Sequence, residues 1–223
     1  MMGFIHFMND AGVVGWIILL TGVGTAVVVV ERARTLIFRY GMNAEEFMNR
    51  VQTLVLSKKH DEALVLCSQL EEKPLARAFK TILEKADRDD ETIFQAQDIA
   101  MSETLPFYTM RLHYLSMLAN VATLLGLLGT IHGLILSFQA VAQADPAAKQ
   151  HLLANGISVS MYTTALGLAV AIPTMVAYSF LVARQNGLIE QATQKCSKLT
   201  ELLTSTHLPP ATVRPPEVHM KVS

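Results

Sequence analysis

Two apolar stretches of the sequence carry hydroxyl side chains at helical spacing. In the first, Ser116, Thr123, Thr130 and Ser137 recur every seven residues, so on a helix they drift only about 20° per repeat. In the second, seven small or hydroxyl side chains fall within about 60° of Ser160 at 100° per residue. They are Gly156, Ser160, Thr163, Thr164, Gly167, Ala171 and Thr174. Hydroxyls on such a helix can hold water or partly hydrated ions, or they can bond to a neighbouring helix.

These two interpretations, a pore wall and a packing surface, compete. Small residues let helix backbones approach closely, and Gly129 with Gly133 forms the GxxxG pattern typical of packed membrane helices. The residues by themselves favour packing. Both interpretations hold together if the two faces enclose a partner helix.

The apolar stretches contain no Asp or Glu. A carboxylate is the usual membrane site for picking up a proton, so we expect any titrating carboxylate to lie on another chain. His132 is the only histidine deep in a stretch. It is either a proton relay or a neutral histidine bonded to a neighbouring helix, and its position opposite Thr123 on the helical wheel favours the second. Pro173 removes one helix hydrogen bond and predicts a kink that frees the carbonyl of Ala169.

Enzymatic chemistry finds no support in the residue patterns. No nucleophile–base–acid set and no Gly-rich phosphate loop is present, and Cys67 and Cys196 show no metal-ligand spacing. We therefore expect no catalysis, no cofactor, no metal and no disulfide. The formal net charge of −1 gives no basic field for nucleic acid.

Three stretches without charged residues predict three membrane spans. Residues 11–30 form a run of 20 apolar, Gly and Thr residues, about the number a helix needs to cross a ~30 Å hydrocarbon core. The runs 112–144 and 150–183 are longer, so each helix should protrude or tilt. Charged residues make up only 17% of the chain, against about 25% in soluble domains, which agrees with this prediction.

The charges that flank these runs predict the orientation. Arg32 and Arg34 follow the first run, Arg111 precedes the second and Arg184 follows the third. Because positive charge stays on the cytoplasmic side, we expect a periplasmic N-terminus and a cytoplasmic C-terminus in a bacterial inner membrane. Residues 1–10 contain no Lys or Arg, which argues against a cleavable signal peptide.

The predicted organisation is an all-α integral membrane protein of three transmembrane helices with long cytoplasmic helical extensions. Its segments are a periplasmic segment 1–10, transmembrane helix 11–30, a cytoplasmic helical domain 31–111, transmembrane helix 112–142, a short periplasmic loop 143–150, transmembrane helix 151–183, a cytoplasmic extension 184–206 and a disordered Pro-rich tail 207–223.

Local signals place helix boundaries in the charged region. Asn43 with Glu46 predicts a capping box that opens a helix, and Pro74 suits the first turn of another. Asp89 or Asp90 is expected to cap a long helix that runs into the second span, with a kink at Pro106.

Two segments then carry a family resemblance. LLGLLGTIHG at 124–133 and YTTALGLAVAIP at 162–173 resemble the ExbB/TolQ/MotA ion-channel family, and in particular its three-span ExbB/TolQ branch. Glu31-Arg32 after the first span is similar to the family as well. Together the two segments are quite specific, and they cover the last two spans in order.

The resemblance implies a homo-pentameric ring in the lipid bilayer around a dimer of a single-span, ExbD/TolR-like subunit whose membrane Asp carries the ion. It implies that Thr130 and Thr164 line the pore. We add Thr163, Ser160, Thr123 and Ser137 as further ion-pathway candidates, and Gly126, Gly129, Gly133, Gly167 and Pro173 as packing residues. A TonB-like protein spanning the periplasm is a further partner that the resemblance admits.

The sequence departs from the family at two positions. Val159 stands where ExbB and TolQ carry a glutamate in the third span, so the ion could be a proton relayed by the partner's Asp or Na⁺. Thr123 stands where a Pro is common, which predicts a straighter second span.

The expected function is the channel-forming subunit of an ion-driven rotary motor, with the proton as the favoured ion, that energises a process at the outer membrane or cell envelope. The alternatives are a non-conducting helical scaffold and a flagellar-type or Na⁺-driven stator subunit. The flagellar type is less favoured because MotA has four spans. A solute carrier is disfavoured because the three spans show no inverted repeat.

Overall fold

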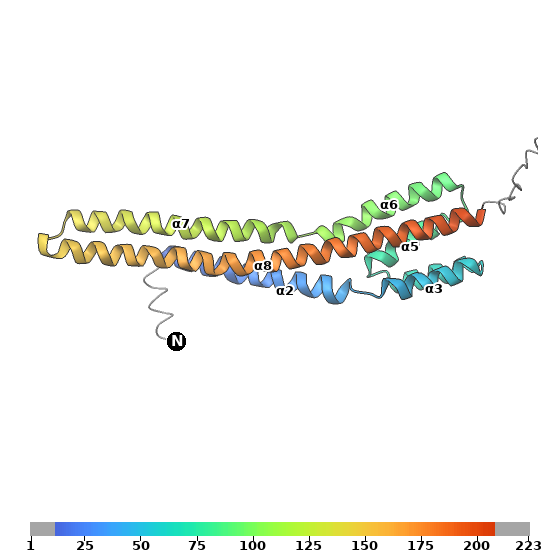
Figure 1. Cartoon of the computed structure of the whole chain (residues 1–223), viewed down its shortest axis with the longest axis horizontal. Coiled ribbons are helices and arrows are strands. Elements are labelled where there is room, and N and C mark those ends of the chain that lie inside the picture. Colours follow the sequence, from blue (N-terminus) through green and yellow to red (C-terminus); the bar gives the residue numbers. More distant parts are fainter. Residues whose placement is uncertain (1–11, 208–223) are drawn as a thin grey trace, which may run out of the picture. The chain divides into compact units, whose positions relative to one another are not determined.

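The computed structural model describes residues 12–207, which form helices joined by short connections, with no strand among them. The elements are α2 (Gly12–Arg34), the π-helix η1 (Thr35–Arg39), α3 (Ala44–Leu56), α4 (His60–Gln69), α5 (Pro74–Leu83), α6 (Asp90–Thr109), α7 (Leu112–Ala142) and α8 (Pro146–His207) (Figure 1). The predicted segment 1–10 and the predicted tail after residue 207 lie outside the described residues.

The described chain divides into two compact units. The membrane bundle comprises residues 12–41 and 106–189, and the short-helix bundle comprises residues 42–105 and 190–207. Helices α6 and α8 contribute residues to both units. Three stretches, within Gly12–Leu56, Asp90–Ala142 and Pro146–Ser205, are long and apolar enough to cross a membrane by length and composition.

The membrane bundle is built on an antiparallel hairpin. Residues 143–145 connect α7 to the start of α8, and α2 lies alongside the two helices (Figure 1). Glu31 near the end of α2 pairs with Arg111 just before α7, so α2 runs antiparallel to α7. The bundle exposes many large apolar side chains, such as Leu20 and Leu124 at 70% and 64%. This is the surface a lipid bilayer would cover.

The short-helix bundle has a core of large apolar side chains. Phe79 is fully buried and its ring lies 5.3 Å from that of Phe47. The other fully buried large side chains of this unit are Met48, Val51, Val55, Ile82, Ile93, Leu199 and Leu203. Pro74 occupies the first turn of α5, as predicted. Cys67 and Cys196 are both buried and free, and burial raises the pKa of the Cys67 thiol to about 12, so it remains protonated.

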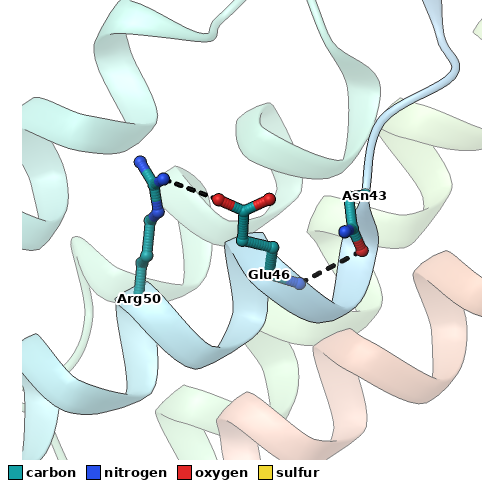
Figure 2. Close-up of polar contacts among 3 residues, drawn as sticks. All are labelled: Asn43, Glu46 and Arg50. Atoms are coloured by element: carbon teal, nitrogen blue, oxygen red, sulfur yellow. Dashed lines mark hydrogen bonds and ion pairs between the residues drawn. The ribbon is translucent and has the colours of Figure 1, made fainter.

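Asn43 caps α3 (Figure 2). Its side-chain oxygen accepts a hydrogen bond from the backbone N–H of Glu46 at 3.3 Å, which confirms the predicted cap. The Glu46 carboxylate accepts instead from Arg50, one turn further along the helix, at 2.6 Å. The neighbouring Glu45 pairs with Lys195 of α8, and that hydrogen bond holds the pKa of the Glu45 carboxyl below its usual range.

The long helix predicted to run into the second span begins at the expected cap but is interrupted before that span. Asp89 caps α6, accepting from the backbone N–H of Thr92 at 3.3 Å, but α6 ends at Thr109, three residues after Pro106. Arg111 then takes a left-handed conformation with φ of 65° before α7 begins. An arginine in this region is uncommon. Its pairing with Glu31 of α2, at 2.7 Å, helps to hold it there.

Candidate ion pathway

Glycines allow α7 and α8 of the hairpin to pack in close contact. A methyl group added at Gly167 would lie 2.7 Å from the carbonyl oxygen of Ala122 and 3.0 Å from the Cα of Gly126. One added at Gly129 would lie 2.5 Å from the Cβ of Thr163. Backbone atoms of the two helices are therefore in direct contact here, which only glycine permits.

The same interlocking continues toward the tip of the hairpin. Ser160 fills the space over Gly133, and Ser137 fills the space over Gly156. Each serine donates its hydrogen to a carbonyl one turn earlier in its own helix, Ser137 to Gly133 at 2.7 Å and Ser160 to Gly156 at 2.8 Å. A hydroxyl on one helix thus faces a glycine on the other along this part of the contact.

The six hydroxyls predicted to line an ion pathway differ in their accessibility. Ser137, Ser160 and Thr163 are buried between the helices of the hairpin at 8%, 3% and 3% exposure. Thr123 is exposed. Thr130 and Thr164 are half-buried. Only the last three offer substantial surface to a molecule outside the hairpin.

Two threonines of α8 lie against the backbone of α7. The Thr164 hydroxyl donates to the carbonyl oxygen of Gly126 at 3.3 Å. The Thr163 hydroxyl lies 3.4 Å from the same oxygen, but it donates its one hydrogen to the carbonyl of Ser160 at 2.7 Å. The Thr130 hydroxyl donates within α7, to Leu127 at 2.6 Å. Because Thr130 is four residues from Gly126, it lies about one turn along the same helix. Thr130 and Thr164, which are far apart in sequence, therefore occupy nearly the same depth of the bundle.

A cavity of about 290 Å³ lies beside this level of the bundle. Its lining combines the start of α2 (residues 12–14), the part of α7 around His132, and Val159, Ser160 and Thr163 of α8. His132 therefore shares a space with two of the α8 hydroxyls. The two hydroxyls belong to α8, so this proximity does not bear on the position of His132 opposite Thr123 on the helical wheel of α7.

A second cavity, of about 540 Å³ and mostly apolar, lies between α2 and α8. Gly22, Val23 and Ala26 line it from α2, and Ala169 and Pro173 line it from α8. Pro173 lies inside the continuous helix α8. Among the described residues, no cluster of His, Cys, Asp or Glu could hold a metal ion.

The model of the MotA/TolQ/ExbB proton channel family matches residues 69–194, more than half of the chain. The chain belongs to this family. The match includes α7, most of α8 and the glycine–hydroxyl contact between them. The resemblance inferred from the two segments is confirmed. The family is one of channels and not of enzymes, and with its three apolar stretches the chain is a multi-pass inner-membrane protein.

Named relatives agree with this membership. The chain is 39% identical over 80 residues to "Biopolymer transport protein exbB1" of Vibrio cholerae, which is 36% of this chain and 35% of that one. It is 36% identical over 97 residues to "Tol-Pal system protein TolQ" of Haemophilus influenzae, covering 44% of this chain and 42% of that one. These matches thus span less than half of either relative.

The fold is also similar to that of a solved family structure. A chain in the structure of C. jejuni MotAB superposes with a TM-score of 0.56 at 17% identity, over 94% of this chain and 84% of that one. At this identity the likeness shows the fold alone.

Sequence reasoning missed two features of this channel-family hairpin. The first is the division of the hydroxyls, since helical spacing ranks Ser160, Thr163 and Thr164 together while the structure buries two and half-exposes one. The second is the cavity at His132, because residues 12–14 belong to a segment far away in sequence. No signal within α7 could have identified it.

Proposed function

We propose that this chain is the channel-forming subunit of a proton-driven motor in the inner membrane. In this proposal five copies surround a dimer of a single-span subunit similar to ExbD or TolR. The partner's membrane Asp carries the proton, and a TonB-like protein can carry the resulting work across the periplasm. One charge crossing 100 mV releases about 2.3 kcal/mol, which is the free energy available to the motor per proton.

The observation that carries the proposal is the placement of Thr130 and Thr164. Both are only half-buried in the chain and lie at nearly the same depth of the α7–α8 hairpin. Thr123 is exposed on the same helix as Thr130. Together they offer hydroxyl oxygens to a guest helix or to water, in a member of a proton channel family.

The lack of acidic groups supports a partner. The described membrane-spanning parts of α2, α7 and α8 contain no Asp or Glu between residues 12 and 30, 112 and 142, or 150 and 183. A motor of this kind needs a group that binds and releases protons within the membrane. In the proposal the partner's Asp provides it, and the buried Ser137, Ser160 and Thr163 support the wall behind the accessible hydroxyls.

The proposed orientation has the N-terminus in the periplasm. The arginines that flank the spans gather at one end of the membrane bundle, where Glu31 pairs with Arg111 at 2.7 Å, whereas Lys149 is the one described positive charge beside the α7–α8 connection. Arg184 lies close to Gly41 at this end. Positive residues at membrane boundaries favour the cytoplasmic side.

The test replaces Thr130 or Thr164 by valine, which keeps the shape and removes the hydroxyl. The complex would be purified through a tag on the full chain and reconstituted in liposomes with a membrane potential, and proton flux would be followed with an internal pH dye. A hydrogen bond to a charged group contributes about 1.5–3 kcal/mol, so we expect at least about a tenfold loss of flux.

Thr21→Val is the matched control. The Thr21 hydroxyl also bonds within its own helix, to Ile17 at 2.9 Å, but Thr21 belongs to α2 and not to the α7–α8 hairpin. Native mass of the purified complex tests the five-to-two stoichiometry. Full flux in both hairpin variants would instead support a non-conducting scaffold whose small residues only pack. Flux that requires Na⁺ would support a Na⁺-driven stator.

A further inference from the structure

His132 is the one imidazole far from both ends of the described membrane-spanning helices, and an imidazole can accept and release a proton. His113 and His151 lie near the starts of α7 and α8, toward opposite ends of the hairpin. An ionisable side chain within a membrane helix is costly and by default marks a functional site. The question is what surrounds this one.

The cavity beside His132 has mixed walls. Val13 and Val14 of α2 and Val159 of α8 make it apolar on two sides, while Ser160 and Thr163 contribute oxygen atoms. No charged side chain of the described chain lines it. Asp10, two residues before Gly12, lies outside the described residues.

The hydroxyls in this cavity are set up to accept hydrogen bonds. Ser160 donates its hydrogen to the carbonyl of Gly156 at 2.8 Å, and Thr163 donates to the carbonyl of Ser160 at 2.7 Å. With their hydrogens engaged, the oxygen lone pairs remain for a donor. An imidazolium ring donates from both nitrogens, and a water molecule donates as well, so either fits these acceptors.

The cavity lies in the half of the hairpin that is nearer the α7–α8 connection. His132 is 20 residues from the start of α7 and ten residues from its end, about 15 Å. In the proposed orientation this is the periplasmic half, from which protons enter. The Thr163 hydroxyl, which lines the cavity, lies 3.4 Å from the carbonyl oxygen of Gly126, to which Thr164 donates.

We propose that this cavity is the proton uptake site of the channel and that His132 is its proton acceptor. The inference rests on the proposed function. A neutral imidazole takes a proton from water at its unprotonated ring nitrogen, and the imidazolium is held by the oxygens of Ser160 and Thr163. It then gives a proton to the next acceptor in the pathway and returns to the neutral form. No bond other than those to the proton changes.

The first test measures proton flux in the liposomes described above while the pH on the side of α2's start is varied from 5 to 8. His132→Gln should lower flux at least about tenfold, in the range expected for a lost acid–base group, and should flatten its pH profile. His132→Glu keeps a titratable group and should restore much of the flux with a different pH profile. His151→Gln changes an exposed histidine outside the cavity and should behave as the unchanged protein.

The second test does not depend on proton flux through any variant. Ring nitrogen-15 NMR of histidine-labelled protein in bilayers, with the His132 signal assigned by its loss in His132→Gln, should show protonation of this ring as the pH falls from 8 to 5. A ring that keeps one protonation state throughout overturns the proposal. So does wild-type flux that His132→Gln leaves unchanged in rate and profile, in which case the channel function still stands.

The remaining outcomes are also decisive. Loss of flux in both His132→Gln and His132→Glu, with no change of protonation in the NMR spectrum, identifies a packing histidine and overturns the proposal. If the unchanged protein conducts no protons at all, the proposed function fails, and the NMR titration then decides separately whether His132 takes up a proton.

Discussion

The two bundles of this chain are held together by different side chains. In the short-helix bundle the buried residues are large, with Phe79, Met48 and Ile82 fully enclosed. In the membrane bundle the α7–α8 contact is made by Gly126, Gly167 and their small neighbours. Large apolar side chains are plentiful in the membrane bundle as well, but many of them point outward.

The solvent explains this difference. In water, burying apolar surface stabilises a fold by about 25 cal/mol per Å², so the largest side chains go inside. In a bilayer the lipid tails are as apolar as leucine, and helices associate through close packing and hydrogen bonds. Small residues then belong at the contact. A hydroxyl at such a contact can face a glycine, as Ser160 faces Gly133, and needs no water.

The largest expected effect on stability comes from a substitution in the core of the short-helix bundle. Phe79→Ala removes a fully buried ring and leaves a cavity, so the free energy of unfolding of this bundle should fall by about 3–5 kcal/mol. Hydrogen exchange of the full chain in nanodiscs should show lost protection in α3 and α5, and unchanged protection in the middle of α7.

Phe94→Ala is the control, because Phe94 is 54% exposed and its loss should change protection little. Equal loss of protection in α7 and α5 after Phe79→Ala would show that the two bundles are one cooperative unit, contrary to the comparison.

A smaller effect is expected from adding one methyl group to the membrane bundle. Gly167→Ala places a carbon 2.7 Å from the carbonyl oxygen of Ala122 and 3.0 Å from the Cα of Gly126. Because these are backbone atoms, the helices must move apart, and we expect a loss of about 1–3 kcal/mol. Thermal unfolding of the detergent-solubilised protein measures it.

Gly24→Ala makes the same change where no atom of another helix lies within 4 Å of the added carbon. Alanine favours a helix interior by about 1 kcal/mol over glycine, so this control should be neutral or slightly stabilising. If both variants behave alike, close packing of glycines does not hold the hairpin together.

The smallest expected effect on stability is at the N-terminal end of α3, in the short-helix bundle. Asn43→Ala removes the side-chain oxygen that accepts from the N–H of Glu46 (Figure 2), which should cost about 1 kcal/mol. Hydrogen exchange should show faster opening of the first turn of α3. Asn43→Asp keeps an acceptor and should retain protection, and Asn49→Ala, at an exposed position within the same helix, should not weaken it. If all three variants exchange at the same rate, the Asn43 side chain does not stabilise the first turn of α3.

Features with local causes could be predicted from the sequence. The cap at Asn43 and the first-turn proline at Pro74 depend on neighbours within four residues, and both are present. The three apolar stretches follow from composition alone. The family follows from two short segments whose residues are adjacent in the chain. The roles of the six hydroxyls and of the five packing residues remain predictions.

Other features depend on which helices meet. The left-handed conformation at Arg111 follows a helix end that Pro106 alone did not locate, and its partner Glu31 is 80 residues away. Helical spacing made Ser160 and Thr164 equivalent, yet α7 covers the first and leaves the second half-exposed.

By itself the sequence determined that the chain is helical, where it can cross a membrane, and which small and hydroxyl residues share a face. The tertiary structure alone decided which hydroxyls the hairpin encloses and that His132 borders a cavity with Ser160 and Thr163. The physical reason is that helical periodicity fixes directions around one axis, whereas burial and cavities depend on the separation of several axes, and these are set by contacts between residues distant in sequence.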